Sequence, residues 1–280
     1  MSNELANGKR RAVRALGWLM LAAGGLSTAV PFLWMLVTAL KPASSVLTIP
    51  PRIAPNEFTL ENFRQVATAF PLVTFFGNSV GVAAVTVASQ VLTGAMAAYA
   101  FARLTFRGRE ALFMVYLATL MVPAQVLMTP LFIMMRWLGW QDTYLGLVAP
   151  GLVSVFGTFL LRQSFLTIPR ALEEAAFIDG ASHWRVFWQI IMPLSKPAVA
   201  TFVVFAFMSS WNSFLWPLII VGSEQHMTLP LGLTMFQGRW MTQWNMLMAG
   251  TLISVLPIVA VYLAAQNQFI KGLTLTGIKG

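Results

Sequence analysis

Long uncharged stretches alternate with short polar ones along this chain. The first uncharged stretch covers residues 15–40 and follows a basic segment with Lys9, Arg10, Arg11 and Arg14. It is longer than the core of a signal peptide and suits a helix that crosses a bilayer, which takes about 20 residues. We therefore predict a retained membrane span at residues 15–40.

Five more apolar segments repeat this pattern. Pro123 and Pro130 interrupt one of them, and such prolines are tolerated where neighbouring helices satisfy the freed carbonyls. The pattern predicts an all-α membrane protein with six spans, no internal repeat and both termini on one side. The five later spans fall within residues 72–102, 111–135, 143–161, 197–222 and 240–270.

The basic residues are shared unevenly between the two sets of loops. Thirteen of the 18 Lys and Arg residues lie in the N-terminal segment, the loop after residue 102, the segment 162–196 and the C-terminal tail. Cytoplasmic loops carry the excess of Lys and Arg in membrane proteins. We therefore expect both termini in the cytoplasm and the loops 41–71 and 223–239 on the other side.

A polar segment at residues 169–197 separates two apolar stretches and holds three of the nine acidic residues. Pro169 suits a first helical position, and Gly180 stands where a left-handed residue ends a helix. Ser182 can cap a second helix, which Pro193 would end. The segment therefore predicts two short helices joined by a glycine turn, the second with an apolar stripe formed by Trp184, Phe187, Trp188 and Ile191.

Composition supports the membrane assignment. Hydrophobic residues make up 58% of the chain and charged residues 10%, and the mean hydropathy is +0.72. The net charge of +9 could suggest a nucleic-acid partner, but the basic residues are scattered through the loops, so we expect none. The absence of Cys excludes disulfides and thiolate metal ligands.

The predicted spans contain no ionisable side chain of the kind that builds proton relays or catalytic sites in lipid. His183 and His226 are the only histidines and both fall in loops, and there is no GxxxxGK[ST] nucleotide loop. We expect no catalytic site, metal or cofactor in this chain, and an energy source on another subunit. The alternative is a secondary carrier or channel, which would need an ion-binding residue or a discontinuous helix at mid-membrane. A membrane enzyme is a more distant third.

The polar segment resembles the EAA signature of the permease subunits of bacterial ABC importers. The residues that carry this resemblance are Glu174-Ala175-Ala176, Asp179-Gly180-Ala181, Phe187, Ile190, Pro193-Leu194 and Pro197. Other segments are similar to the carbohydrate-type members, and to the smaller permease of the maltose transporter family, at Trp211-Asn212, Phe214-Leu215-Trp216-Pro217, Gly272-Leu273, Gly277 and Lys279-Gly280.

The resemblance implies a type I ABC importer permease fold in the bacterial cytoplasmic (inner) membrane. Residues 1–280 would be one transmembrane permease domain, with a cytoplasmic coupling segment at residues 167–196. The implied partners are a second homologous permease, two cytoplasmic ATPase subunits that bind ATP and Mg, and an external solute-binding protein. The implied function is import of a sugar or sugar-like solute, with a non-sugar solute such as a polyamine as the alternative.

The resemblance also assigns roles to particular residues. The residues that it implies in docking on the ATPase and coupling to it are Glu173, Glu174, Ala175, Ala176, Asp179, Gly180, Ala181, Phe187, Ile190 and Pro193. The tail with Gly272, Leu273, Gly277, Lys279 and Gly280 would reach the ATPase interface, and its glycines favour an extended backbone. A solvated helix face and a free chain end are the simpler interpretations of these two segments.

Small polar residues in and near the fifth span suggest a path for the solute. Ser209, Ser210, Asn212 and Ser213 cluster there, and Gln125 lies between two prolines. Such residues also serve as contacts between membrane helices, worth about 0.6 to 2 kcal/mol each. A structural role therefore competes with solute contact at each of these positions.

Overall fold

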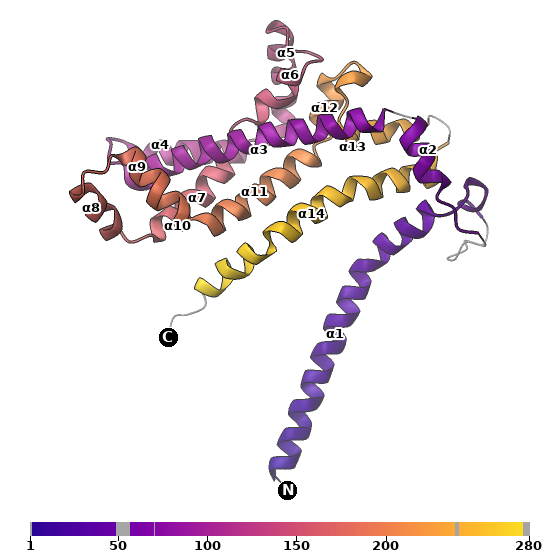
Figure 1. Ribbon diagram of the computed structural model, residues 1–280, viewed down its shortest axis with the longest axis horizontal. Coiled ribbons are helices and arrows are strands. Elements are labelled where there is room, and N and C mark those ends of the chain that lie inside the picture. Colours follow the sequence, from indigo (N-terminus) through magenta and orange to yellow (C-terminus); the bar gives the residue numbers. More distant parts are fainter. Residues whose placement is uncertain (1, 49–56, 70, 239–240, 277–280) are drawn as a thin grey trace. The chain divides into compact units, whose positions relative to one another are not determined.

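A computed structural model describes residues 2–48, 57–69, 71–238 and 241–276, with side chains over 14–48, 57–68, 71–238 and 241–266. Within these ranges the chain is helical apart from turns, loops and an isolated bridge between Gln237 and Thr242 (Figure 1). Contacts divide the chain into two compact units, residues 1–70 with 233–253 and residues 71–232 with 254–280. The predicted single domain stays a prediction.

The first unit holds helix α1 (Ser2–Ala39), the short η1 (Ala43–Ser45), α2 (Glu61–Ala69), η6 (Leu233–Phe236) and the beginning of α14 (Trp244–Thr276). The buried Asn62 donates to the carbonyls of Ala39 at 2.7 Å and Lys41 at 2.8 Å, and it accepts a hydrogen bond from Asn245 at 2.7 Å. The last carbonyls of a helix lack hydrogen-bond donors within the helix. The Asn62 amide supplies these donors at the end of α1.

The second unit is built along helix α3 (Leu72–Arg103), against which α7 (Val155–Thr167) and α11 (Lys196–Trp211) pack (Figure 1). The helices approach closely because α3 contributes small residues to the core. The ring of Phe202 on α11 occupies the space that a Cβ at Gly157 on α7 would need. The buried core consists of Ala95, Ala98, Tyr99, Ala102, Leu161, Phe165, Val186, Phe187, Ile191, Phe202 and Ala206.

Two of the predicted spans are bent. Helix α4 (Arg109–Ala118) with η2 (Thr119–Met121) meets α5 (Ala124–Trp137) at 95°, and α6 (Tyr144–Val148) with η3 (Ala149–Gly151) meets α7 at 43°. Four helices in the described part of the chain are long and apolar enough to cross a membrane, or up to six if each bent pair is one span. The all-helical membrane fold is confirmed, and the count of six spans stays a prediction.

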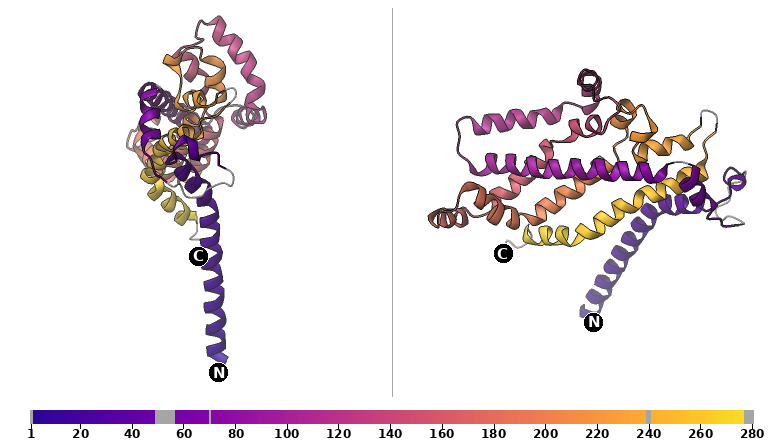
Figure 2. Two further views of the ribbon diagram at one scale, coloured as in Figure 1. Left: turned by 90° about the vertical axis from the view of Figure 1, so that its right-hand side faces the viewer. Right: turned by 45° about the horizontal axis from the view of Figure 1, so that its top comes forward.

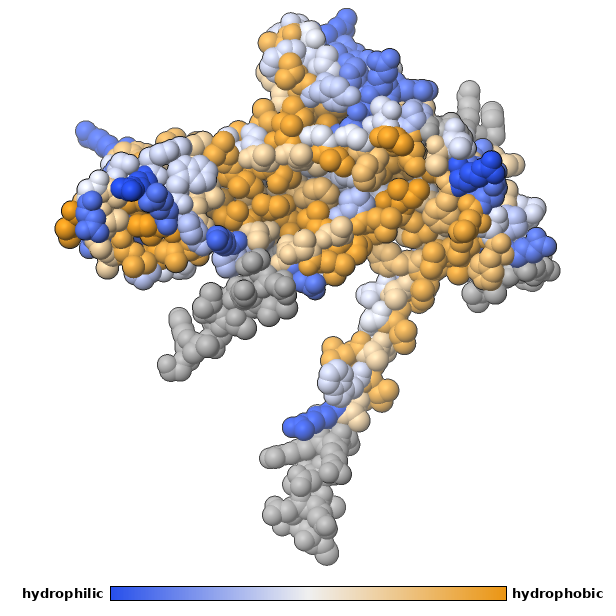
Figure 3. All heavy atoms as spheres, viewed as in Figure 1, coloured by the Kyte–Doolittle hydropathy of each residue, from blue (hydrophilic) through white to orange (hydrophobic). Residues whose placement is uncertain are grey.

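The two ends of α3 carry different structures (Figures 1 and 2). The short helices α8 (Ala171–Ile178), α9 (His183–Val186), the π-helical η4 (Phe187–Ile191) and α10 (Met192–Leu194) lie at one end. The helices α12 (Leu215–Ile220) and α13 (Leu229–Gly232), with η5 (Glu224–His226), lie toward the other. On the face that Figure 3 shows, apolar side chains cover most of the surface between the two ends, and hydrophilic ones lie around α8 and α9.

Candidate functional site

The polar segment folds into the two predicted short helices, but the first of them, α8, begins at Ala171 and not at Pro169 as expected. Gly180 has a φ of 80° after α8, and the Ser182 hydroxyl accepts a hydrogen bond from the backbone N–H of Arg185 at 3.3 Å. The expectation that Pro193 ends the second helix is wrong, because the chain stays helical to Leu194. The π-helical turn before Pro193 widens the backbone, and proline at the start of a helical turn needs no N–H partner.

A buried ion pair attaches α8 to the rest of the second unit. Arg103 Nε lies 2.8 Å from Glu173 Oε1, and the two side chains are only 4% and 8% exposed. The guanidinium also donates to the carbonyls of Phe165 at 2.6 Å and Ile168 at 2.7 Å. These carbonyls lie at the end of α7, where helical partners are missing. One arginine therefore joins the ends of α3 and α7 to α8.

The environment of Glu173 makes this pair sensitive to substitution. Burial raises the pKa of the Glu173 carboxyl above its ordinary value, against the opposing effect of the Arg103 guanidinium. Loss of one partner of a buried pair leaves the other charge uncompensated, which is costly. The pair therefore fixes the position of α8 rather than adding a freely solvated charge.

The ten predicted coupling residues separate into two groups by exposure. The exposed ones are Glu174, Ala175, Asp179, Gly180 and Pro193. The buried or half-buried ones, which pack inside the unit, are Glu173, Ala176, Ala181, Phe187 and Ile190. The first group is the more accessible to another chain. The exposed apolar Ile178 belongs with it and was missed by sequence reasoning, which looked for an inward stripe.

The predicted aromatic stripe is also divided. Phe187 and Ile191 are buried in the core, whereas Trp184 and Trp188 are 60% and 41% exposed. The stripe packs on the protein's own helices through Phe187 and Ile191. Both tryptophans remain at the surface, where an interface with lipid or another chain would meet them.

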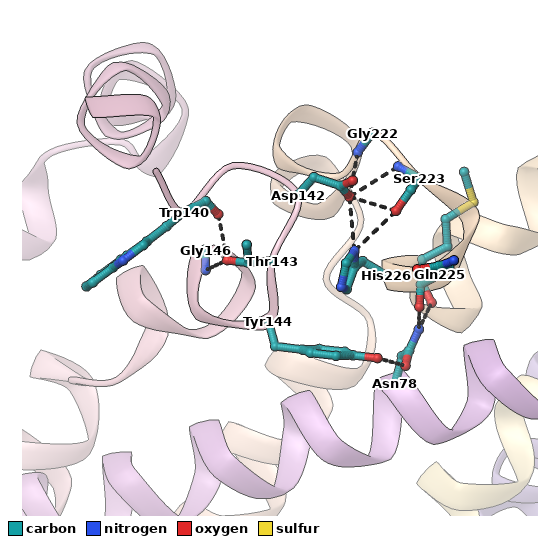
Figure 4. Close-up of polar contacts among 11 residues, drawn as sticks. Asn78, Trp140, Asp142, Thr143, Tyr144, Gly146, Gly222, Ser223, Gln225 and His226 are labelled. Atoms are coloured by element: carbon teal, nitrogen blue, oxygen red, sulfur yellow. Dashed lines mark hydrogen bonds and ion pairs between the residues drawn. The ribbon is translucent and has the colours of Figure 1, made fainter. Parts of the chain in front are cut away.

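A polar network joins two loops at the other end of the second unit (Figure 4). Asp142 Oδ1 accepts hydrogen bonds from the N–H of Gly222 at 3.0 Å and from the N–H and hydroxyl of Ser223 at 3.1 Å. It also lies 3.2 Å from His226 Nδ1. Asp142 has a φ of 54°, a conformation uncommon outside glycine, so the network holds a strained turn in place.

Asn78 extends this network to α3. Its amide donates to the carbonyls of Gln225 and Met227, both at 2.8 Å, and it accepts a hydrogen bond from the Tyr144 hydroxyl at 2.8 Å (Figure 4). Burial of Asp142 raises the pKa of its carboxyl, but the hydrogen bonds from Gly222, Ser223 and His226 together hold that pKa below its ordinary value. The sequence flagged none of these contacts, since they join positions far apart in the chain.

The predicted solute path is only partly assembled by the structure. Ser209, Ser210 and Ser213 line a pocket of about 310 Å³ together with Thr86, Gln90 and other residues. Asn212 is exposed and its amide donates to Met208 O in its own helix at 2.9 Å, while Gln125 is exposed and lies outside this pocket. The pocket therefore combines three of the predicted serines with residues that sequence reasoning did not include, and their contact with a solute stays a prediction.

The predicted C-terminal contact lies mostly beyond what the structure describes. Gly272 and Leu273 belong to α14, which continues as helix to Thr276, so the expected extended backbone is wrong for this part of the tail. Gly277, Lys279 and Gly280 lie outside the described residues. The role of the tail stays a prediction.

Comparison with known proteins agrees with this geometry. Residues 90–273 match the family described as "Binding-protein-dependent transport system inner membrane component". The arabinooligosaccharides transport system permease protein AraQ of Halalkalibacterium halodurans is 34% identical, covering 97% of this chain and 100% of the relative. The inner membrane ABC transporter permease protein YcjP of Escherichia coli is 34% identical over 99% and 100%. The lactose transport system permease protein LacG of Rhizobium radiobacter is 31% identical over 95% and 96%.

Solved structures share the fold. A chain of a bacterial ABC transporter involved in the import of the acidic polysaccharide alginate aligns with a TM-score of 0.81 and 22% identity, covering 92% of this chain and 97% of that one. A chain of the alginate transporter in complex with a pentasaccharide-bound periplasmic protein aligns with a TM-score of 0.62 and 15% identity, over 89% and 92%. With the matched family segment and full-length relatives, the chain belongs to the binding-protein-dependent transport system inner membrane components, the multi-pass permeases of ABC transporters.

Proposed function

We propose that this chain is one of two permease subunits of an ATP-driven importer for a sugar or sugar-like solute, with both termini in the cytoplasm. Relatives named for arabinooligosaccharide and lactose transport support the solute class. The uncharged apolar segments support a permease whose energy comes from separate ATPase subunits. The basic residues around the N-terminus and the polar segment support the orientation.

The exposed face of α8 is the proposed docking surface for an ATPase subunit. The observation that carries this proposal is the contrast between two adjacent carboxylates. Glu173 is buried and paired with Arg103, whereas Glu174 is exposed next to Ala175, a small residue that lets another backbone come close. A helix fixed on one side and open on the other can transmit a displacement, because the ion pair ties it to α3 and α7.

Transport would then follow from movement of the ATPase pair. Closure of that pair on ATP displaces α8, and Arg103 passes the displacement to the ends of α3 and α7. These helices form much of the unit and would turn the displacement into alternating access to the solute. At the other end, the loops joined by Asp142 are the proposed landing site for an external solute-binding protein, such as the periplasmic protein in the alginate transporter complex.

The test is ATP hydrolysis by the purified complete complex in lipid, with its solute-loaded binding protein. We expect Glu174→Ala to lower stimulated hydrolysis at least about fivefold, equivalent to about 1 kcal/mol. Glu57→Ala, which removes an exposed carboxylate that belongs neither to α8 nor to the loops joined by Asp142, is the matched control and should keep parental hydrolysis. Normal assembly with parental stimulation in the Glu174 variant would contradict the docking assignment.

A further inference from the structure

Two helix breaks meet beside α3 and leave a pocket between them. The first break separates η3 from α7 at residues 152–154, and the second separates α11 from α12 at residues 212–214. Side chains of α3 satisfy carbonyls at the first break, since Gln90 donates to Gly151 O at 2.6 Å and Ser89 to Leu152 O at 2.9 Å. Irregular backbone at membrane depth is tolerated where it is supported by protein or lines a cavity.

The pocket between these breaks has the size and composition of a small-ligand site. Its volume of about 310 Å³ is at the lower end of the roughly 300–1,000 Å³ range of such sites. Trp216 of α12 lines the wall, and its indole is fixed by donation to Gly146 O at 3.0 Å. Much of the remaining wall is apolar, with Val82, Leu127, Met128, Leu131, Leu147, Pro150 and Pro217.

Several polar groups of the wall lack partners in the described part of the chain. The hydroxyls of Thr86, Ser210 and Ser213 make no hydrogen bond there, although Thr86 is only 6% exposed. The hydroxyl of Thr228 is buried with no partner among the described residues. Buried polar groups are normally hydrogen-bonded, and an unpaired one costs free energy. A polar molecule in the pocket would supply the missing partners.

The wall also restricts the charge of that molecule. None of the described residues that line the pocket is ionisable. An anion or a polyamine that enters the pocket loses its hydration, and the described wall of this chain offers no opposite charge in exchange. Such a transfer into an apolar environment is unfavourable. A sugar ring has hydroxyls at its rim and apolar C–H faces, so it matches a wall with hydroxyls, an amide and an indole.

We infer that this pocket binds one ring of a neutral sugar during passage, with Thr86 and Thr228 as hydrogen-bonding residues and Trp216 as the platform for a ring face. The inference rests on the proposed importer function. It adds the location of a sugar site in this chain and the requirement that the solute be uncharged, which we call its charge class. It excludes polyamines and acidic sugars as solutes recognised by this chain.

The absence of cysteine from the chain allows a direct test in the complete complex. Ser213→Cys places a unique thiol in this subunit at the pocket wall, and N-ethylmaleimide labels it at a measurable rate. The probes are lactose and arabinobiose, which are neutral, sn-glycerol 3-phosphate, an anion, and putrescine, a cation. We expect only the neutral probes to slow labelling of the Ser213→Cys thiol. A thiol introduced as Thr201→Cys lies outside the pocket, and its labelling rate should be the same with and without each probe.

The pocket residues are then tested in the Ser213→Cys background. Thr86→Val or Thr228→Val should raise the half-protecting sugar concentration about three- to tenfold, as expected for one lost hydrogen bond. In the described part of the chain the Thr201 hydroxyl donates only to Pro197 O in its own helix, at 2.9 Å, so Thr201→Val should leave this concentration unchanged. The Thr228→Val complex should unfold at the parental temperature or above, because it loses an unpaired buried hydroxyl; a lowered temperature would indicate a structural role instead.

The outcomes separate this inference from the proposed function. ATP-dependent uptake of a neutral probe without protection of the thiol, or with parental protection in both valine variants, would overturn the pocket assignment and leave the importer intact. Protection by sn-glycerol 3-phosphate or putrescine would overturn the charge class. If the complex carries out no ATP-dependent uptake of any probe, the proposed sugar importer and the pocket both fail.

Discussion

Arg103 and Glu173 lie 70 positions apart in the chain and form an ion pair that water hardly reaches. The same guanidinium binds two carbonyls at the end of α7, so three helices meet at one side chain. The pair therefore places the exposed Glu174 in a fixed orientation. The short helix α8 gains through this contact a rigidity that eight residues cannot supply alone.

Substitution of Glu173 should destabilise the complex far more than substitution of its neighbour. Glu173→Ala leaves the buried Arg103 guanidinium uncompensated, and breaking such a pair costs about 3–5 kcal/mol when fully buried. Glu174→Ala removes an exposed charge and should change stability by no more than about 0.5 kcal/mol. Thermal unfolding of the purified complex measures both. Equal unfolding temperatures would show that the pair does not hold α8.

Gly180 should tolerate asparagine and reject valine. Its φ of 80° strains a β-branched residue, at a cost of about 1–2 kcal/mol, while asparagine visits this region more readily. No heavy atom lies within 4 Å of a Cβ built at this position, so the effect comes from the backbone alone. We expect Gly180→Val to lower solute-stimulated ATP hydrolysis and Gly180→Asn to retain most of it. Equal loss in both variants would point to a side-chain clash with a partner instead.

Local sequence signals were sufficient to predict the two short helices of the polar segment. Contacts between residues far apart in the sequence could not be predicted from such signals. The cap at Ser182 and the left-handed Gly180 follow from neighbouring residues, so the two short helices could be predicted. The pairing of Arg103 with Glu173 depends on tertiary packing, and a lone arginine at the end of a span carries no sign of it. For the same reason the sequence suggested Ser210 and Ser213 for a solute path but gave no sign that Thr86 lies beside them in one pocket.

The bent spans show a second limit of sequence reasoning. Hydropathy measures how apolar a segment is and does not report its direction, so residues 111–135 were predicted as one span interrupted by prolines, with no bend angle. The structure bends by 95° next to Pro123, which lacks the N–H that would continue the helix. Proline marked the position of the break, but the angle depends on packing against other helices.

Asp142 should hold its two loops together at neutral pH and release them in acid. Its lowered pKa means that the folded state favours the carboxylate, so the stabilisation is present above the unfolded-state pKa of about 3.9 and is lost as the pH falls through the lower folded value. Hydrogen-exchange protection of the Gly222 and Ser223 amides, which donate to this carboxylate, reports the effect.

The matched variant is Asp142→Asn. An amide oxygen accepts these hydrogen bonds more weakly, so protection of the two amides should already be lower at neutral pH and should lose its dependence on acid. Glu224→Gln, an exposed carboxylate in the same loop, should behave as the parent. An acid-dependent loss of protection that persists in Asp142→Asn would assign the effect to another group.

Both termini should be found in the cytoplasm. The prediction rests on the excess of Lys and Arg in the N-terminal segment, the loop after α3, the polar segment and the tail. An alkaline phosphatase fusion after Gly280 should be inactive and one near Asn56 active, since that enzyme works outside the cytoplasm. Activity at Gly280 would reverse the topology and remove α8 from the side where ATP is available.

The close packing of α7 on α11 should make Gly157 intolerant of even one methyl group. The Phe202 ring fills the position of a Cβ at residue 157, and Phe202 is buried in the core, so it cannot move out to solvent. Overpacking of this kind costs about 1–3 kcal/mol, and Gly157→Ala should lower the unfolding temperature of the complex. Gly24→Ala is the control, because nothing lies within 4 Å of its Cβ position in α1 and alanine is the better helix former.

If the clash is the cause, Phe202→Leu should cost less in the Gly157→Ala background than in the parent, since a smaller side chain makes room for the added methyl. Additive effects of the two substitutions would show that Gly157 is required for another reason.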